Sequence, residues 1–231
     1  MKNIVIATIK EWNINNYFEL KKELENEYSL YLLTNKDELS FKNIEKINPK
    51  YIFFPHWSWI IPENIYKNYE CILFHMTDLP YGRGGSPLQN LIINKVYNTK
   101  ISAIKVSKEL DEGDVYLKED FDISKGSANE IYKNASKLIF KKLIPNILRQ
   151  NPTPVRQEGD VVNFKRRTPE QSNIKMLNDV SIANLYDFIR MLDAPSYPKA
   201  YLELDNLKME LFEVIIKDGK LEGRFEVSKH E

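Results

Sequence analysis

Two short segments contain the residues best suited to chemistry. His75 ends an apolar run and precedes a glycine-rich segment at residues 81–86, and Asp111 lies in Leu110-Asp111-Glu112-Gly113-Asp114. An imidazole takes up and releases protons near neutral pH, and a neighbouring carboxylate favours its charged form. Taken singly, a strand-end histidine and an acidic turn are more often structural than catalytic, so neither segment alone predicts a function.

Several other chemistries lack their usual patterns. Neither His56 nor His75 has a second metal-type ligand at a useful spacing, and the single cysteine, Cys71, falls in an apolar run, so no metal site is expected. His230 lies next to the C-terminus and is not expected to take part in chemistry. Nucleophile elbows of the Gly-x-Ser-x-Gly type, phosphate loops ending in Gly-Lys-Ser/Thr and dinucleotide-binding Gly-x-Gly-x-x-Gly turns do not occur at the expected places.

The elements that must position these residues follow from hydrophobic periodicity. Short apolar runs alternate with segments of helical spacing, which predicts an open, mostly parallel, Rossmann-like α/β sheet. Strands are expected at 3–7, 29–34, 51–54, 71–74, 100–107 and 114–121, and helices at 16–26, 40–47, from Pro62, at 87–94 and at 127–148. Ligands of such sheets bind beyond the carboxyl ends of strands, where His75 falls.

Pro152-Thr153-Pro154 marks a change in character. We expect a catalytic domain over residues 1–163 and a small C-terminal domain of α+β or β type over 164–231. The latter should contain a helix at 181–192 and strands at 199–204, 208–216 and 220–227, with Asp218-Gly219 as a hairpin turn.

Composition narrows the class of protein. The 231 residues include 33 Lys and Arg and 33 Asp and Glu, so no overall field attracts nucleic acid or an anionic membrane. One cysteine permits no internal disulfide, and the N-terminal apolar run is too short for a signal peptide or a membrane span. We therefore expect a cytoplasmic protein without nucleic-acid or membrane partners, as a monomer or a homodimer.

Taken together, the segments resemble a known family. His75-Met76-Thr77-Asp78-Leu79-Pro80, followed by Arg83-Gly84 and by a small residue before Pro87, is similar to the signature of the folate-dependent formyltransferases. The segment 110–114 resembles the family's second motif, Leu-Asp-x-Gly-Asp, and 165–172 resembles its Arg-rich stretch between domains. Each motif is weak alone, but the three occur in the family's order, and the resemblance covers most of the chain.

The resemblance implies a formyltransferase fold and a set of site residues. His75 would be the general acid and base and Asp111 would tune it. Residues expected against 10-formyltetrahydrofolate, the implied co-substrate, are Trp57, Ser58, Trp59, Thr77, Asp78, Leu79, Pro80, Ser107, Leu110 and Asp114. Residues expected against the acceptor substrate are Arg83, Gly84, Gly85, Arg166, Arg167, Arg190 and Tyr197, with Tyr201 as an alternative to Tyr197 for stacking on a base.

One position departs from the family pattern. The family places an oxyanion-stabilising Asn two residues before the histidine, and this chain has Leu73 there. His75 itself, His56 or a backbone amide of the glycine-rich segment are alternative donors. A folate-binding or nucleotide-sugar-binding protein without turnover is a further alternative.

The acceptor expected from the resemblance is a nucleotide-linked amino sugar. The C-terminal region is short and near-neutral, and Arg190 with Tyr197-Pro198 resembles sugar-modifying members. UDP-4-amino-4,6-dideoxy-N-acetyl-altrosamine, an intermediate of the pseudaminic-acid pathway, is the nearest substrate by resemblance. The alternatives are methionyl-tRNA, glycinamide ribonucleotide, and water as in formyl-folate hydrolases.

Overall fold

A computed structural model describes residues 1–195 and 197–229. The chain forms two compact units. The first contains Met1–Arg83, Thr99–Phe121 and Lys133–Asn163, and the second contains Gly84–Asn98, Asp122–Tyr132 and the chain from Phe164. The domain division at 163/164 stays a prediction. Within the described residues, no helix is long and apolar enough to cross a membrane.

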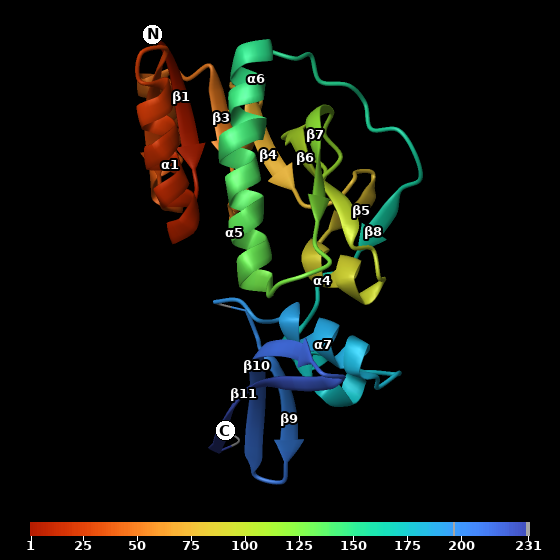
Figure 1. The fold of residues 1–231 in the computed structure, drawn as a ribbon. Helices are drawn as coiled ribbons and strands as arrows, with labels where there is room; N and C mark the ends of the chain where they lie inside the picture. Colours follow the sequence, from red (N-terminus) through yellow and green to blue (C-terminus); the bar gives the residue numbers. More distant parts are fainter. Residues whose placement is uncertain (196, 230–231) are drawn as a thin grey trace. The chain divides into compact units, whose positions relative to one another are not determined.

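A six-stranded sheet forms the centre of the first unit (Figure 1). Its order is β2-β1-β3-β4-β6-β7. The strands are β1 (Lys2–Ala7), β2 (Tyr28–Leu33), β3 (Tyr51–Phe54), β4 (Cys71–His75), β6 (Asn98–Lys105) and β7 (Val115–Asp122). The first four run parallel, and β6 is antiparallel to β4 with His75 opposite Ser102. The predicted mostly parallel α/β sheet is confirmed.

The central strands are apolar because both of their faces are covered. Ile4, Ile52 and Ile72 are fully buried on three neighbouring strands, as expected for parallel strands with helices on both faces. Helices accompanying the sheet are α1 (Glu11–Leu24), α2 (Phe41–Ile47), α3 (Glu63–Tyr66), α5 (Ala128–Leu138) and α6 (Ile144–Gln150).

The helices α5 and α6 form one continuous rod in Figure 1. A π-helical turn, Ile139–Leu143, joins them. Helix α1 lies beside this rod, since Asn16 Nδ2 donates to Ser136 Oγ at 2.7 Å and Glu19 pairs with Lys141 at 3.1 Å.

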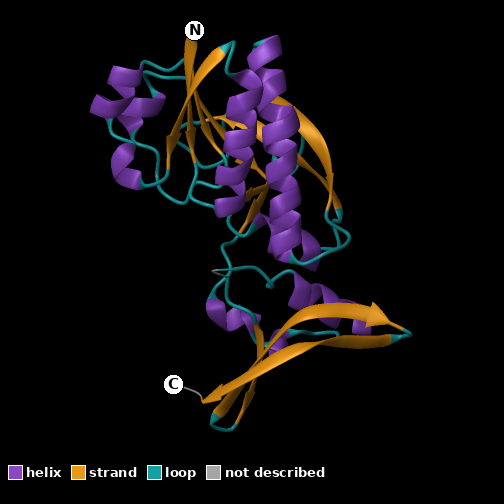
Figure 2. Cartoon of the chain, turned by 60° about the vertical axis from the view of Figure 1, so that its left-hand side comes forward, coloured by secondary structure: helices purple, strands orange, loops and turns teal. Residues whose placement is uncertain are grey.

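The second unit contains a three-stranded antiparallel sheet, with long β10 and β11 strands visible in Figure 2. Its elements are α4 (Pro87–Ile93), α7 (Ile182–Arg190), β9 (Ala200–Leu204), β10 (Leu207–Lys217) and β11 (Lys220–Lys229), with short 3₁₀ helices at Pro169–Ser172 and Ile174–Met176. The sheet order is β11-β10-β9, and Lys217 pairs with Lys220 across the hairpin turn. The predicted β appendage is confirmed.

A small sheet was not anticipated from the sequence. β5 (Tyr81–Gly84) lies within the glycine-rich segment and pairs with β8 (Val162–Phe164). A Cβ atom at Gly84 would lie 2.4 Å from the carbonyl oxygen of Phe164, so the close approach of these strands requires glycine there.

Candidate active site

The structure brings His75 and Asp111 together in a buried site. His75 ends β4 and is 8% exposed, and Asp111 lies between β6 and β7 and is 6% exposed. His75 Nδ1 is 3.5 Å from Asp111 Oδ1, while His75 Nε2 is 2.8 Å from the carbonyl oxygen of Gly82. A carbonyl can only accept, so Nε2 carries a hydrogen. In the neutral ring Nδ1 is then the basic atom, and it faces the carboxylate.

The turn that carries Asp111 is tightly built. Asp111 has a φ of 56°, in the left-handed region. A Cβ atom at Gly113 would lie only 1.7 Å from the carbonyl oxygen of Lys105, and Lys105 N donates to Asp114 O at 2.8 Å. Glycine at 113 therefore allows the chain to pass against β6 and to return Asp111 over the site.

Gln157 supports this turn and was not anticipated from the sequence. Its Nε2 donates to the carbonyl oxygens of Asp111 and Gly113, each at 2.8 Å. Its Oε1 accepts from Arg83 Nε at 3.1 Å and Nη2 at 2.9 Å. Arg83 Nη1 also pairs with Glu112 at 3.0 Å. No motif marks Gln157, because its role depends on contacts between distant segments. Arg83, expected against substrate, directs its guanidinium at these protein groups.

Leu73 occupies the position where the family resemblance places an asparagine. Its side chain is half-buried and packs against Leu79, Ile104 and Val115. It lies opposite Ile104 in the β4–β6 register. This apolar environment offers nothing to orient an amide, so an oxyanion donor has to come from another position.

Two tryptophans lie beyond the end of β3. Trp57 and Trp59 make an edge-to-face contact with ring centroids 4.8 Å apart, and Trp59 is 39% exposed. Ser58 is exposed beside them. The indole N–H of Trp57 is buried without a partner among the described residues. The exposed ring of Trp59 offers a stacking surface to a flat heterocycle, while the Trp57 N–H lies beneath the surface.

The residues after His75 divide into buried and exposed groups. Thr77 and Leu79 have no exposed surface, and Thr77 Oγ1 donates to Gly82 O at 3.3 Å. Pro80 is buried and follows a cis peptide bond. Asp78 is partly exposed and pairs with Lys118 at 2.5 Å. The side chains of Thr77 and Leu79 thus shape the loop, while Asp78 lies at its surface.

The loop before Asp111 lies at the surface. Ser107 is exposed and its Oγ donates to Glu109 O at 3.0 Å, and Leu110 is 70% exposed. Asp114 is half-buried. This loop is therefore accessible from solvent, and its role as a folate wall stays a prediction.

The structure groups several of the expected substrate residues in the second unit. Ser86 Oγ accepts from the backbone N–H of Arg167 at 3.1 Å and lies 3.4 Å from the hydroxyl of Tyr197. Gly85 approaches Arg166 so closely that a Cβ atom would lie 2.6 Å from its Cβ. Burial lowers the pKa of the Arg167 guanidinium, and Tyr197 opposes this shift.

Arg190 is not part of that group. It is 1% exposed, its Nε pairs with Asp187 at 2.7 Å, and its Nη1 donates to the carbonyl oxygens of Ile123 and Gly126, each at 3.0 Å. Its guanidinium ties segments of the second unit together rather than pointing at solvent.

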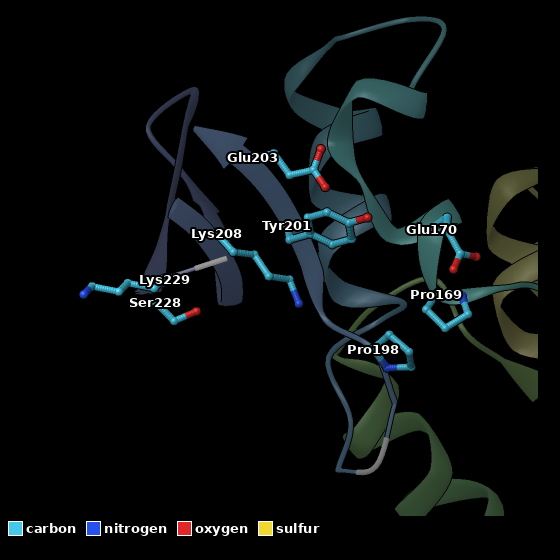
Figure 3. Close-up of a pocket in the computed structure, with 8 residues that line it drawn as sticks. All are labelled: Pro169, Glu170, Pro198, Tyr201, Glu203, Lys208, Ser228 and Lys229. Atoms are coloured by element: carbon cyan, nitrogen blue, oxygen red, sulfur yellow. The ribbon is translucent and has the colours of Figure 1, made fainter. Parts of the chain in front are cut away.

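A pocket of about 380 Å³ lies on the second unit, and Figure 3 shows the residues that line it. It is lined by Pro169, Glu170, Pro198, Tyr201, Glu203, Lys208, Ser228 and Lys229. The Lys208 Nζ lies 4.8 Å from the centre of the Tyr201 ring and pairs with Glu210 at 2.8 Å. The lining charges are thus of both signs, and Tyr201 is already covered by a cation.

Among the described residues, the remaining reactive groups do not build a second site, and His230 lies outside the described residues. Burial raises the pKa of the Cys71 thiol to about 12, so it is not a nucleophile at neutral pH. Burial, aided by Lys10, lowers the pKa of His56 to about 4. In the described part of the chain, no three His, Cys, Asp or Glu side chains form a group that could hold a metal ion.

Several known proteins are similar to this chain in sequence or in structure. The family described as methionyl-tRNA formyltransferase, C-terminal domain, matches residues 169–228. A structure described as methionyl-tRNA formyltransferase from Clostridium thermocellum is 49% identical, with a TM-score of 0.95 over 99% of this chain and 100% of that one. A sugar N-formyltransferase from a Shewanella species shares the fold, with a TM-score of 0.71 and 15% identity over 97% of this chain and 96% of that one.

The match to curated proteins is partial. A methionyl-tRNA formyltransferase from Rickettsia canadensis is 28% identical over 60% of this chain and 47% of its own. The chain thus spans about half the length of such curated relatives. The resemblance to sugar-modifying members, expected from Arg190 and Tyr197, is weaker than the resemblance to methionyl-tRNA formyltransferases.

Proposed function

The chain belongs to the folate-dependent formyltransferase family, and from this we propose that it transfers a formyl group from 10-formyltetrahydrofolate to a primary amine. The observation that carries the proposal is the buried pair of His75 Nδ1 and Asp111 Oδ1, 3.5 Å apart. Acid–base catalysis by a placed imidazole accelerates reactions by about 10²–10⁴-fold.

The protein groups would manage the protons of this reaction. The formyl donor supplies the electrophilic carbon, and its nitrogen must be protonated to leave. His75 Nδ1, the basic atom of the neutral ring, would take the proton of the attacking amine. Asp111 would stabilise the imidazolium, and the Gly82 carbonyl would hold the other ring nitrogen in place. His75 would then return the proton to the leaving group.

The residues available to hold the donor lie on three loops. Trp59 presents an exposed ring beside the half-buried Trp57. The exposed loop from Ser107 to Leu110 would form the opposite wall, with Asp78 near the formyl end. These roles are inferred from the exposure of the loops and from the family resemblance.

The acceptor that the relationships support best is methionyl-tRNA. The 49% identity extends over the whole of a structure that carries this description, and the C-terminal region matches the corresponding domain family. This proposal replaces the expectation that nucleic acid is not a partner. The cytoplasmic location stays a prediction.

A nucleotide-linked amino sugar is the second candidate, favoured by charge. Residues 169–228 contain seven Lys and Arg and eleven Asp and Glu, a formal net charge of −4. A protein that neutralises tRNA phosphates gains affinity from Lys and Arg, whereas a small diphosphate needs only a few cations. Arg166 and Arg167, near Tyr197 and Ser86, would serve the smaller substrate.

One experiment separates these acceptors. The protein is incubated with 10-formyltetrahydrofolate and either methionyl-tRNA or UDP- and dTDP-linked 4-amino sugars, and formylated product is measured by mass. Formylation of methionyl-tRNA with a salt-dependent KM supports the first candidate, and formylation of the sugars alone supports the second. Folate binding without product from any amine would refute transferase activity and favour a binding protein.

A further inference from the structure

We propose that Gln157 is a positioning residue for formyl transfer: its amide, anchored by Arg83, holds the turn that presents Asp111 to His75. The inference rests on the proposed function and adds a residue that the family motifs do not contain. Gln157 lies in Arg156-Gln157-Glu158-Gly159, between the second and third motifs in the sequence.

The donor end of Gln157 grips the catalytic turn at two points. Both amide hydrogens are used, since Nε2 lies 2.8 Å from the carbonyl oxygens of Asp111 and Gly113. These carbonyls flank Glu112, so the two bonds fix the backbone of the turn rather than one side chain. Asp111 needs this support because its φ of 56° lies in the left-handed region, which residues other than glycine adopt at a cost.

The acceptor end connects the turn to the other side of the site. Gln157 Oε1 receives two hydrogen bonds from Arg83, whose third nitrogen pairs with Glu112 of the turn. Arg83 follows Gly82, the residue whose carbonyl holds His75 Nε2. One continuous set of contacts thus links the two ring nitrogens of His75, through β5, Gln157 and the acidic turn.

The backbone around Gln157 is itself fixed. Val155 exchanges two hydrogen bonds with Val115 on β7, at 2.7 and 2.9 Å. Val162 N donates to Pro80 O at 3.3 Å on the far side. The side chain therefore extends from an anchored segment, and the side chain of Arg83 is only 13% exposed. A side chain can position the Asp111 turn to within a fraction of an ångström only if it is itself held in place, as Gln157 is.

The experiment compares Gln157→Leu and Gln157→Glu with the wild type. Leu removes every polar contact, while Glu keeps acceptors for Arg83 and loses both donors. Both variants should lower kcat about 10- to 100-fold and change the KM for folate less than twofold. In an Asp111→Asn background, Gln157→Leu should lower kcat no further, because the turn then positions a group that no longer acts. Arg156→Ala, next in sequence and exposed, is the matched control and should retain wild-type kcat.

A second readout does not depend on turnover. The imidazole NMR resonances of His75, assigned by their loss in His75→Asn, should move in Gln157→Leu in the same direction as in Asp111→Asn. Unchanged resonances, an unchanged kcat in an active enzyme, or additive losses in the double variant would overturn the positioning role. If the wild type transfers no formyl group, the proposed function fails while the NMR shift still tests the clamp.

Discussion

Gly113→Ala tests how closely the catalytic turn is packed against β6. The added Cβ atom would lie 1.7 Å from Lys105 O and 2.8 Å from Lys105 C. Both are backbone atoms, so no side chain can rotate away. Reaching van der Waals contact requires about 1.5 Å of backbone displacement. That displacement would strain the Lys105 N–Asp114 O bond and the bond from Gln157 to Gly113.

The expected cost is the sum of these effects. Overpacking costs about 1–3 kcal/mol, and each weakened hydrogen bond about 1 kcal/mol. We therefore expect a loss of about 3–4 kcal/mol in the free energy of unfolding, with Tm about 10 °C lower. Displacing the turn by this amount would also move Asp111 away from His75, and kcat should fall about 100-fold.

Tryptophan fluorescence during urea unfolding is the appropriate assay. All three tryptophans, at 12, 57 and 59, lie in the first unit, as does Gly113. Gly159→Ala is the matched control in the same unit: Gly159 has a φ of 115°, but its nearest neighbour would be 3.9 Å from the new Cβ. The control should cost about 1 kcal/mol through backbone strain alone. A Gly113→Ala loss no greater than that of the control would refute the steric reasoning.

Three further predictions concern other residues of the structure. His75→Ala and Asp111→Ala should each lower the formyl-transfer rate by at least about 100-fold with unchanged circular dichroism, and near-normal rates would refute their assignment. The pKa of His56 is about 4 in the folded protein and about 6.5 in the unfolded chain, so the unfolded state binds more protons between these two pH values. The free energy of unfolding should therefore fall by on the order of 2–3 kcal/mol as the pH drops from 6.5 to 4. Urea titrations of His56→Gln should show a smaller dependence on pH. Arg190→Met should cost about 3 kcal/mol of stability, measured by thermal unfolding, because it removes the donor to Asp187 Oδ1 and to the carbonyl oxygens of Ile123 and Gly126, while Lys95 and Tyr97 still bond to Asp187 Oδ2. The folded variant should keep its KM, and a KM raised tenfold in a stable variant would contradict this structural role.

Local patterns predicted the strands well because burial on both faces demands continuous apolar runs. Residues 51–54 and 71–74, expected from such runs, correspond to β3 and to all but the last residue of β4. The helix expected over 127–148 was harder to predict in detail. Pro145 lies within it and lacks an N–H, and the structure places a π-helical turn just before, where the hydrogen-bond pattern already changes.

Contacts between distant segments were not accessible in this way. The direction of β6, antiparallel to β4, depends on how a long connection returns to the sheet and leaves no local signal. The same holds for β5 and β8, whose pairing joins residues about 80 positions apart, and for the bonds from Gln157 to the acidic turn. The motifs therefore predicted that His75 and Asp111 meet, but not what holds them together.

Leu73 shows how packing and chemistry compete at one position of β4. A side chain at this position packs against the cluster of Leu79, Ile104 and Val115. An asparagine amide here would be transferred from water to apolar neighbours, which would destabilise the fold unless the amide formed hydrogen bonds. Leucine at this position instead extends the apolar core along β4 to within two residues of His75. The histidine two positions later is held through Gly82 on one side and the carboxylate on the other. With the neighbouring position apolar, the imidazolium formed during proton transfer is the cation best placed to counter negative charge that develops beside it. Asp111, and the Gln157 contacts that hold it, would then matter twice: for moving the proton, and for keeping that positive charge in the site.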